Sequence, residues 1–503
     1  MSNMFNVLVI GGGPAGVTAA LRARELGASV ALVERAELGG VGTHEGCVPV
    51  RVLAKAARLM READHFDEYG LVGERPAVDL PILFERVRQT VGHMRDKKQL
   101  RAHLQQAGIV VYTGVGQAQF ADESTILLPD GARLGADKFI LCAGGRPRHL
   151  PLPGIEHALT HTDIWAMKVL PRSVAIIGAA ATGCQLASIF AAFGAEVTLL
   201  ERAGRILDKE DTLTSETMAR AFRQRGIRVI DGIDRVDRIL KTGDRLRLLY
   251  NRQAETLPLD VEAVIVAAGW PGNADSLNLG VAGVASERGY VLVDDYLQTS
   301  APHIFAAGDI NGRMMLVQSA SYEARIAAEN AVLGVGQPNR HQIVPHGGFT
   351  DPEYASVGLT EVQARAADRD CLVAVVPYAD LDRAVIDERT GGFCKLIVSA
   401  ETHRILGAHI VGEQALEAIQ LIAAGMAADM WVEQLAELEL AYPTYTAIVG
   451  LAARQLVHDL GVMPLAPQWR ALGKGHATEW ERSETDDLTP EPEIAPASLE
   501  LGG

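Results

Sequence analysis

The sequence predicts an α/β fold with two Rossmann-like, three-layer domains and a C-terminal α+β domain. The first observation is a continuous apolar run, NVLVI at residues 6–10, followed by GGGPAG, an alanine-rich helix and a strand that ends on Glu34. The second is that this order recurs, from SVAII at residues 173–177 to a strand that ends on Glu201. Such runs between helices are typical of parallel strands buried on both faces. The third is a region of mixed strands and helices that begins near residue 341.

The first turn carries the spacing Gly11-x-Gly13-x-x-Gly16. The first glycine permits a tight turn, the second lets the backbone approach a pyrophosphate, and the third allows close packing of helix on strand. Glu34 follows roughly 20 residues later, where an acid accepts hydrogen bonds from a ribose hydroxyl. Strand, glycines, helix and acid in this order predict a dinucleotide site.

The second turn reads Gly178-x-Ala180-x-x-Gly183, so alanine replaces the middle glycine and adds a methyl group where the pyrophosphate should approach. Glu201 favours an unphosphorylated ribose, which predicts NADH. Arg202 and Arg205 lie nearby and keep NADPH as the alternative. The other interpretation of this repeat is a structural unit that no longer binds a nucleotide.

Length and composition limit the remaining choices. A chain of 503 residues is too long for one hydrophobic core, and its net charge of −16 argues against nucleic acid as a partner. The five cysteines show neither disulfide nor zinc spacing, so no metal site is expected, and no apolar run is long enough for a spanning helix. The cytoplasm is the expected location. The expected domains are a first nucleotide-binding domain at residues 1–147 and 268–340, a second at 148–267, a third domain at 341–460, and a disordered acidic tail at 461–503.

The chain resembles the pyridine nucleotide-disulfide oxidoreductases, the family of dihydrolipoamide dehydrogenase, mercuric reductase and soluble transhydrogenase. The resemblance rests on both glycine motifs and on the further segments CAGGRPR (142–148), AAGWPGNADSL (267–277), IFAAGD (304–309), FTDPEYASVGLTE (349–361) and RILGAHIVG (404–412). It implies FAD in the first domain, with Gly144 and Asp309 among its contacts and Asp309 on the ribityl chain. It also implies a nicotinamide cofactor in the second domain and a homodimer formed by the third.

The family's active-site segment carries two cysteines, and the matching segment here is GGVGTHEGCVPVR, residues 39–51. Cys47 stands at the flavin-proximal cysteine and Gly42 at the other, so this segment cannot form a disulfide. Arg51 replaces the family's lysine, and Gln185 replaces the glutamate that pairs with it. We therefore expect an arginine without its counter-charge and a more positive field near the flavin.

The family's C-terminal histidine–glutamate pair is also changed, to Tyr442 and Ala447. A tyrosine is a poor general base at neutral pH, but its hydroxyl can donate a hydrogen bond.

For two residues of the 39–51 segment, we consider a role in the chemistry and a purely structural role. Cys47 is expected at a helix N-terminus, where the helix dipole and Arg51 would depress its pKa toward the thiolate. The alternative is a leftover small residue packed under the flavin. His44 either touches a substrate or is an ordinary polar group in a glycine-rich loop. The other four cysteines are expected in the core.

The sequence therefore predicts a homodimeric FAD-dependent NAD(P)H oxidoreductase. It would pass hydride from NADH to FAD and electrons on to a small acceptor other than a disulfide: a quinone-like molecule, oxygen or a second nicotinamide. One alternative is an enzyme like dihydrolipoamide dehydrogenase or mercuric reductase, against which Gly42 and Ala447 speak. The other is a catalytically silent flavoprotein that serves as a subunit of a complex.

Overall fold

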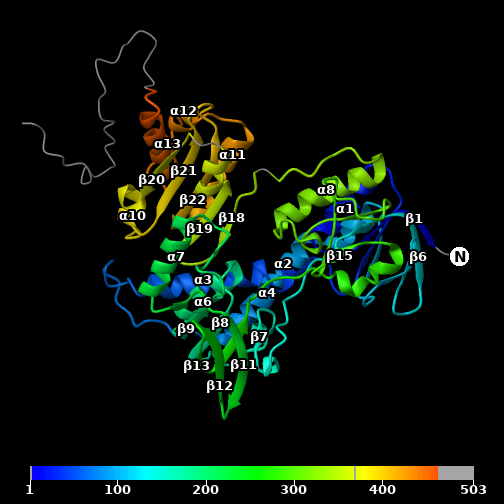
Figure 1. Ribbon diagram of the computed structural model, residues 1–503, viewed down its shortest axis with the longest axis horizontal. Helices are drawn as coiled ribbons and strands as arrows, with labels where there is room; N and C mark the ends of the chain where they lie inside the picture. The colour runs from blue at the N-terminus through cyan, green and yellow to red at the C-terminus, as the bar shows by residue number, and fades with distance from the viewer. Residues whose placement is uncertain (1–2, 342, 368–369, 463–503) are drawn as a thin grey trace, which may run out of the picture. The chain divides into compact units, whose positions relative to one another are not determined.

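The computed structural model describes residues 3–341, 343–367 and 370–462 (Figure 1). The chain divides into two compact units, residues 1–358 and 359–503. Nearly all of the predicted acidic tail lies outside the described residues. Among the described residues, no helix is both long and apolar enough to cross a membrane.

A seven-stranded sheet organises the first part of the first unit. Its order is β3-β2-β1-β6-β5-β4, and β17 pairs with the other edge of β6. β1, β2, β3, β6 and β17 run parallel, whereas β4 and β5 join in antiparallel pairs. The strands are β1 (Asn3–Ile10), β2 (Val30–Glu34), β3 (Val110–Thr113), β4 (Gln119–Asp122), β5 (Thr125–Leu127), β6 (Arg133–Leu141) and β17 (Ile304–Ala306).

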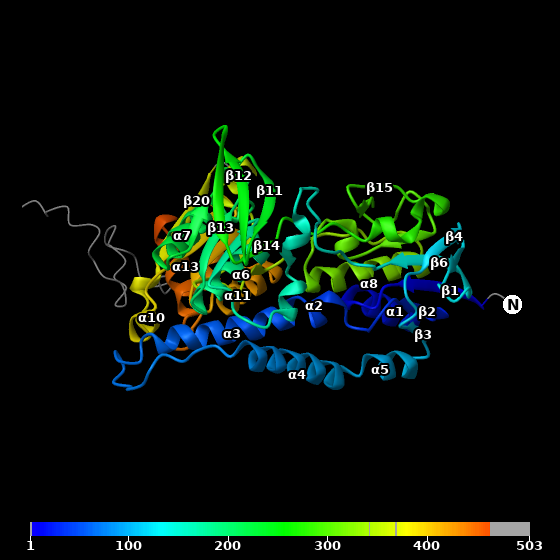
Figure 2. The same cartoon turned by 90° about the horizontal axis from the view of Figure 1, so that it is seen from below.

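Helices α1 (Pro14–Glu25) and α8 (Val317–Leu333) pack together against this sheet (Figure 2). Small side chains such as Ala19, Ala324 and Ala327 are fully buried between them, which allows the close approach. Three further helices lie between Cys47 and Gln106, with residues 64–79 outside them. They are α3 (Cys47–Ala63), α4 (Leu80–Lys98) and α5 (Leu100–Gln106), preceded by the short α2 (Gly40–His44).

The second part of this unit also contains a parallel sheet with helices packed against it. Five parallel strands have the order β10-β9-β8-β14-β7, and a three-stranded antiparallel sheet, β11-β12-β13, packs beside them. The strands are β7 (Leu159–Thr160), β8 (Ser173–Ile177), β9 (Glu196–Leu200), β10 (Arg228–Ile230), β11 (Arg235–Thr242), β12 (Arg245–Arg252), β13 (Glu255–Val261) and β14 (Ala263–Val266). The helices are α6 (Ala181–Ala192) and α7 (Thr212–Gln224).

Two crossing segments, residues 143–148 and 269–273, connect the halves and run side by side. Arg146 N donates to Pro271 O at 2.9 Å, Asn273 N donates to Gly144 O at 2.9 Å, and Gly145 bridges Gly272 in antiparallel fashion. The first unit ends in a hairpin of β18 (His346–Gly348) and β19 (Glu353–Gly358). Its remaining short elements are β15 (Ser286–Glu287), β16 (Tyr290–Val291), η1 (Ile155–His157), η2 (Asp163–Ala166), η3 (Ala274–Leu277), η4 (Leu279–Ala282) and η5 (Asp309–Asn311).

The second unit contains an antiparallel sheet in which β21 lies between β20 and β22, with α13 packed on β20 and β21. Its apolar strands and helices agree with the α+β character predicted for this region. Its elements are β20 (Cys371–Pro377), β21 (Phe393–Ser399), β22 (Ile405–Gly412), α9 (Glu361–Ala367), α10 (Asp382–Ile386), α11 (Ala415–Ala427), α12 (Val432–Ala436), α13 (Ala447–Asp459) and η6 (Tyr378–Asp380).

Candidate functional site

The turn between β1 and α1 has no room for side chains at two of its glycines. Gly11 has a φ of +109°, and a Cβ there would lie 2.2 Å from the carbonyl oxygen of Cys142. A Cβ at Gly16 would lie 1.7 Å from the carbonyl oxygen of Gly11. Gly13 is the N-cap of α1, and no side chain caps the first turn there. The backbone N–H groups of that turn are the donors that a phosphate would use.

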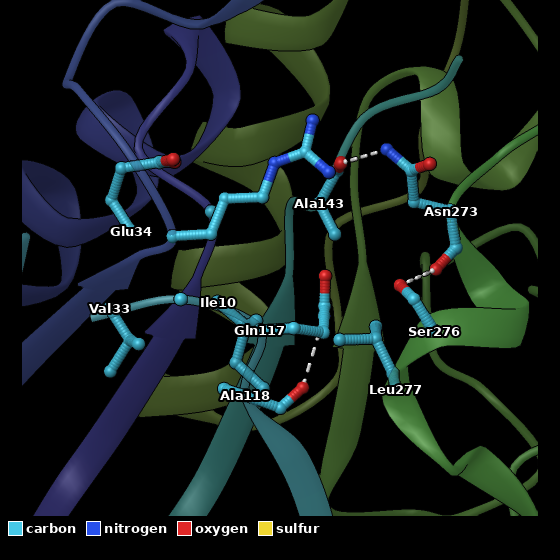
Figure 3. Close-up of a pocket in the computed structure, with 12 residues that line it drawn as sticks. Ile10, Val33, Glu34, Gln117, Ala118, Ala143, Asn273, Ser276 and Leu277 are labelled. Atoms are coloured by element: carbon cyan, nitrogen blue, oxygen red, sulfur yellow. Dashed lines mark hydrogen bonds between the residues drawn. The ribbon is translucent and has the colours of Figure 1, made fainter. Parts of the chain in front are cut away.

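Glu34 is held at the end of β2 by two backbone donors. Its carboxylate accepts from Gly12 N at 2.6 Å and from Ala36 N at 2.8 Å. The residue is buried and borders a pocket at the carboxyl edge of the first sheet (Figure 3). The pocket is lined by Ile10, Gly11, Val33, Glu34, Arg35, Gly116, Gln117, Ala118, Ala143, Asn273, Ser276 and Leu277.

Asp309 follows β17 at the same edge of this sheet. Its Oδ2 accepts a hydrogen bond from Trp270 Nε1 at 3.0 Å. Burial raises the pKa of the Asp309 carboxyl; the Trp270 bond opposes that rise, and the nearby Glu323 carboxylate adds to it. The glycine turn follows β1, and Glu34 ends β2. Gly144 and Asp309 follow β6 and β17. These four strands are parallel neighbours in one sheet. This arrangement of donors, acid and pocket fits a dinucleotide such as FAD.

The second glycine turn repeats the geometry of the first. Gly178 has a φ of +103°, and a Cβ at Gly183 would lie 1.8 Å from Gly178 O. Ala180, the N-cap of α6, has φ −78° and ψ −170°, against −74° and −173° at Gly13. The backbone of Ala180 is therefore unstrained. Its methyl group differs from Gly13 only in filling space at the N-terminus of α6, where a pyrophosphate would approach. Glu201 accepts from Ala179 N at 2.6 Å and from Ala203 N at 2.9 Å, as Glu34 does in the first turn.

The predicted active-site segment forms α2 and the start of α3. Cys47 is the first residue of α3, as predicted, and is exposed, whereas Cys142, Cys184, Cys371 and Cys394 are buried. All five cysteines are free thiols. Gly42 lies within α2, and a Cβ there would lie 3.3 Å from Val317 Cγ2.

The prediction that the pKa of the Cys47 thiol is lowered is wrong. The pKa of its thiol is raised, first because the surrounding protein atoms desolvate the sulfur, although the residue keeps an exposed face. A backbone hydrogen bond lowers the pKa, and the Asp309 carboxylate raises it. The position of Cys47 at the N-terminus of α3 therefore does not lower the pKa enough to offset desolvation. Arg51 is not among the groups that shift this pKa.

The expectation that Arg51 has lost its counter-charge is also wrong. Its Nη1 lies 3.2 Å from Glu353 Oε1, and its guanidinium lies 4.4 Å from the centre of the Phe349 ring. Gln185 accepts from Phe349 N at 3.1 Å and donates to Ala181 O at 3.1 Å. Arg51 and Gln185 thus both contact Phe349. The carboxylate that pairs with Arg51 is that of Glu353 on β19.

His44 and Tyr442 also have defined partners. The Nε2 atom of the partly buried His44 lies 2.9 Å from Leu38 O. Tyr442, in the second unit, is exposed and donates a 2.8 Å hydrogen bond to Asp382 Oδ2. Glu353, Asp382 and Trp270 were missed by the sequence reasoning. Of these, Glu353 and Trp270 do lie within quoted motifs, FTDPEYASVGLTE and AAGWPGNADSL.

Two family models match the chain. Residues 5–324 match pyridine nucleotide-disulphide oxidoreductase, and residues 344–453 match the dimerisation domain of the same name.

Several known proteins are similar to this chain along most of its length. A mercuric reductase from Lysinibacillus sphaericus is 32% identical over 459 residues, which cover 91% of this chain and 83% of the relative. A dihydrolipoyl dehydrogenase from Bacillus subtilis is 31% identical, covering 90% of this chain and 98% of the relative. The solved structure of the HOCl-induced flavoprotein disulfide reductase RclA from Escherichia coli superposes with a TM-score of 0.79 at 28% identity, over 89% of this chain and 99% of that one. The predicted fold class and family resemblance are confirmed.

Proposed function

We propose that this chain, which belongs to the pyridine nucleotide-disulphide oxidoreductase family, passes electrons from NADH through FAD to an acceptor other than a disulfide. The family makes it an FAD-dependent NAD(P)H oxidoreductase, and its dimerisation domain supports a homodimer. The preference for NADH and the identity of the acceptor belong to the proposal.

The observation that carries the proposal is the lone thiol of the 39–51 segment. A disulfide needs two sulfur atoms about 2 Å apart. Gly42 has no side chain, and the other four thiols are buried in the core. The 39–51 segment therefore offers Cys47 no second thiol, which argues against two-electron storage in a disulfide at this segment.

The electrostatics of the second glycine turn support NADH. The Glu201 carboxylate, just after β9, would repel a 2′-phosphate and accept hydrogen bonds from a ribose hydroxyl. Arg205, which could have offset that charge, donates to Asp208 O at 2.7 Å and to Glu210 O at 2.9 Å. Arg205 is thus engaged with the backbone, whereas Arg202, next to Glu201, keeps NADPH as the alternative.

The residues of the first half would bind and orient FAD. The N-terminus of α1 would hold the pyrophosphate, Glu34 the adenosine ribose and Asp309 the ribityl chain. When bound, the flavin accepts hydride from a nicotinamide and can reduce one- or two-electron acceptors. We name quinone-like molecules, oxygen and a second nicotinamide as acceptors, because none of them needs a protein disulfide.

A steady-state acceptor survey tests this proposal. With NADH as donor, we expect turnover with a benzoquinone or oxygen and none with lipoamide or mercuric ion, the substrates that the names of the relatives suggest. Lipoamide turnover at a comparable rate would overturn the proposal. Tight FAD without reduction by NADH or NADPH would instead support the silent-flavoprotein alternative.

The variant C47S separates the two interpretations of this thiol. Strongly reduced turnover would mean that Cys47 takes part in electron transfer, whereas unchanged turnover would mean that it is only a packed residue. The raised pKa of its thiol leads us to expect the second result.

A further inference from the structure

Trp270 contacts a residue from each nucleotide-binding half. Its indole Nε1 donates the 3.0 Å hydrogen bond to Asp309, which follows β17 in the first half. His161, which follows β7 in the second half, packs against the same ring with centroids 5.0 Å apart and planes at 57°. His161 is only 7% exposed, so this contact is buried.

The position of the indole is fixed by its surroundings. The backbone on either side belongs to the paired crossing segments, and Tyr290 Oη donates to Trp270 O at 2.8 Å. A Cβ at Gly145 would lie 2.4 Å from Trp270 Nε1, so the glycine makes the room that the ring occupies. The ring has little freedom to turn its N–H away from Asp309.

The hydrogen bond matters because Asp309 is partly desolvated. Burial favours the neutral carboxylic acid, and the Glu323 carboxylate, which is fully buried on α8, acts in the same direction. The Trp270 N–H is the side-chain donor that opposes both effects. A hydrogen bond to a charged group contributes more than one between neutral groups.

We propose that Trp270 is a positioning residue for FAD: its indole N–H fixes the orientation of the Asp309 carboxylate, so that the carboxylate can accept hydrogen bonds from the ribityl hydroxyls. The role rests on the proposed function, in which Asp309 binds the ribityl chain. Trp270 acts through Asp309, and His161 keeps the ring in place from the nicotinamide-binding half.

A double-mutant cycle on FAD affinity tests the proposal. FAD is removed from the full-length protein, and its dissociation constant is measured by titration of flavin fluorescence for the parent chain, W270F, D309N and the double variant. We expect W270F to weaken binding by about tenfold or more. We expect the double variant to bind no more weakly than D309N, because the indole has no carboxylate left to hold.

The matched control is W165F. Trp165 also packs against an aromatic ring, that of Phe84, but its buried Nε1 has no hydrogen-bond partner among the described residues. W165F also removes an indole N–H, but one that holds no carboxylate. We therefore expect this variant to bind FAD within twofold of the parent value.

Three results would overturn the proposal. W270F could bind FAD like the parent chain, or it could weaken binding equally with and without D309N, which would indicate packing alone. D309N could also bind FAD normally, in which case Asp309 does not hold the cofactor and Trp270 cannot act through it. Reduction of the parent protein's flavin by NADH reports separately on the proposed function.

Discussion

Cys47 differs from the other cysteines in exposure, and its surroundings decide its reactivity. Because desolvation raises the pKa of its thiol, the thiolate population at pH 7 is smaller than that of an ordinary cysteine and grows only as pH rises through the raised pKa. We predict slow alkylation by iodoacetamide at pH 7 that accelerates steeply in the alkaline range. Mass spectrometry of one labelled site measures it, with C47S as the blank since the other four thiols are buried. Fast labelling at pH 7 would mean that the helix dipole dominates after all.

Ala180 permits a second prediction about a single residue. Its backbone angles match those of Gly13, so A180G changes the space above the helix start without relieving strain. We predict a lower KM for NADH, by a few-fold, with FAD affinity unchanged. An unchanged KM would show that the methyl group does not meet the nucleotide.

At the scale of elements, the two strand–turn–helix units make the same contacts and allow a matched pair of substitutions. G16A would place a Cβ 1.7 Å from Gly11 O, and G183A would place one 1.8 Å from Gly178 O. Each change should force its helix away from its strand. We predict that G16A abolishes FAD binding. We predict that G183A keeps FAD but loses its reduction by NADH.

Flavin absorbance of the purified variants and anaerobic addition of NADH measure the two effects. Dithionite, which needs no nucleotide site, controls for the ability of the flavin in G183A to be reduced. Loss of FAD from G183A, or normal NADH reduction in that variant, would contradict the assignment of the two turns to two cofactors.

At the scale of the whole molecule, the sequence predicted what depends on local pattern. Continuous apolar runs located β1, β2, β8 and β9, and glycine spacing located both turns, because a positive φ or a missing Cβ is a property of one position. Glu34 and Glu201 were predicted because an acid at the end of the second strand is part of the same local unit.

Contacts between distant segments could not be predicted in this way. Arg51 and Glu353 are 302 residues apart in the chain, and Trp270, in a crossing segment, is 39 residues away from Asp309. The pKa of Cys47 depends on how many protein atoms surround the sulfur, which the helix position alone does not give. The errors therefore fall on side-chain partners that are distant in the sequence.

An anaerobic titration of the yellow holoenzyme with NADH shows whether this protein has an active flavin without a redox disulfide. The flavin spectrum is followed while NADH is added in known amounts. We predict complete reduction by about one equivalent of NADH per flavin and no further electron uptake, because the 39–51 segment has no second thiol beside Cys47. Uptake of about two equivalents would reveal a second two-electron centre and would contradict the account.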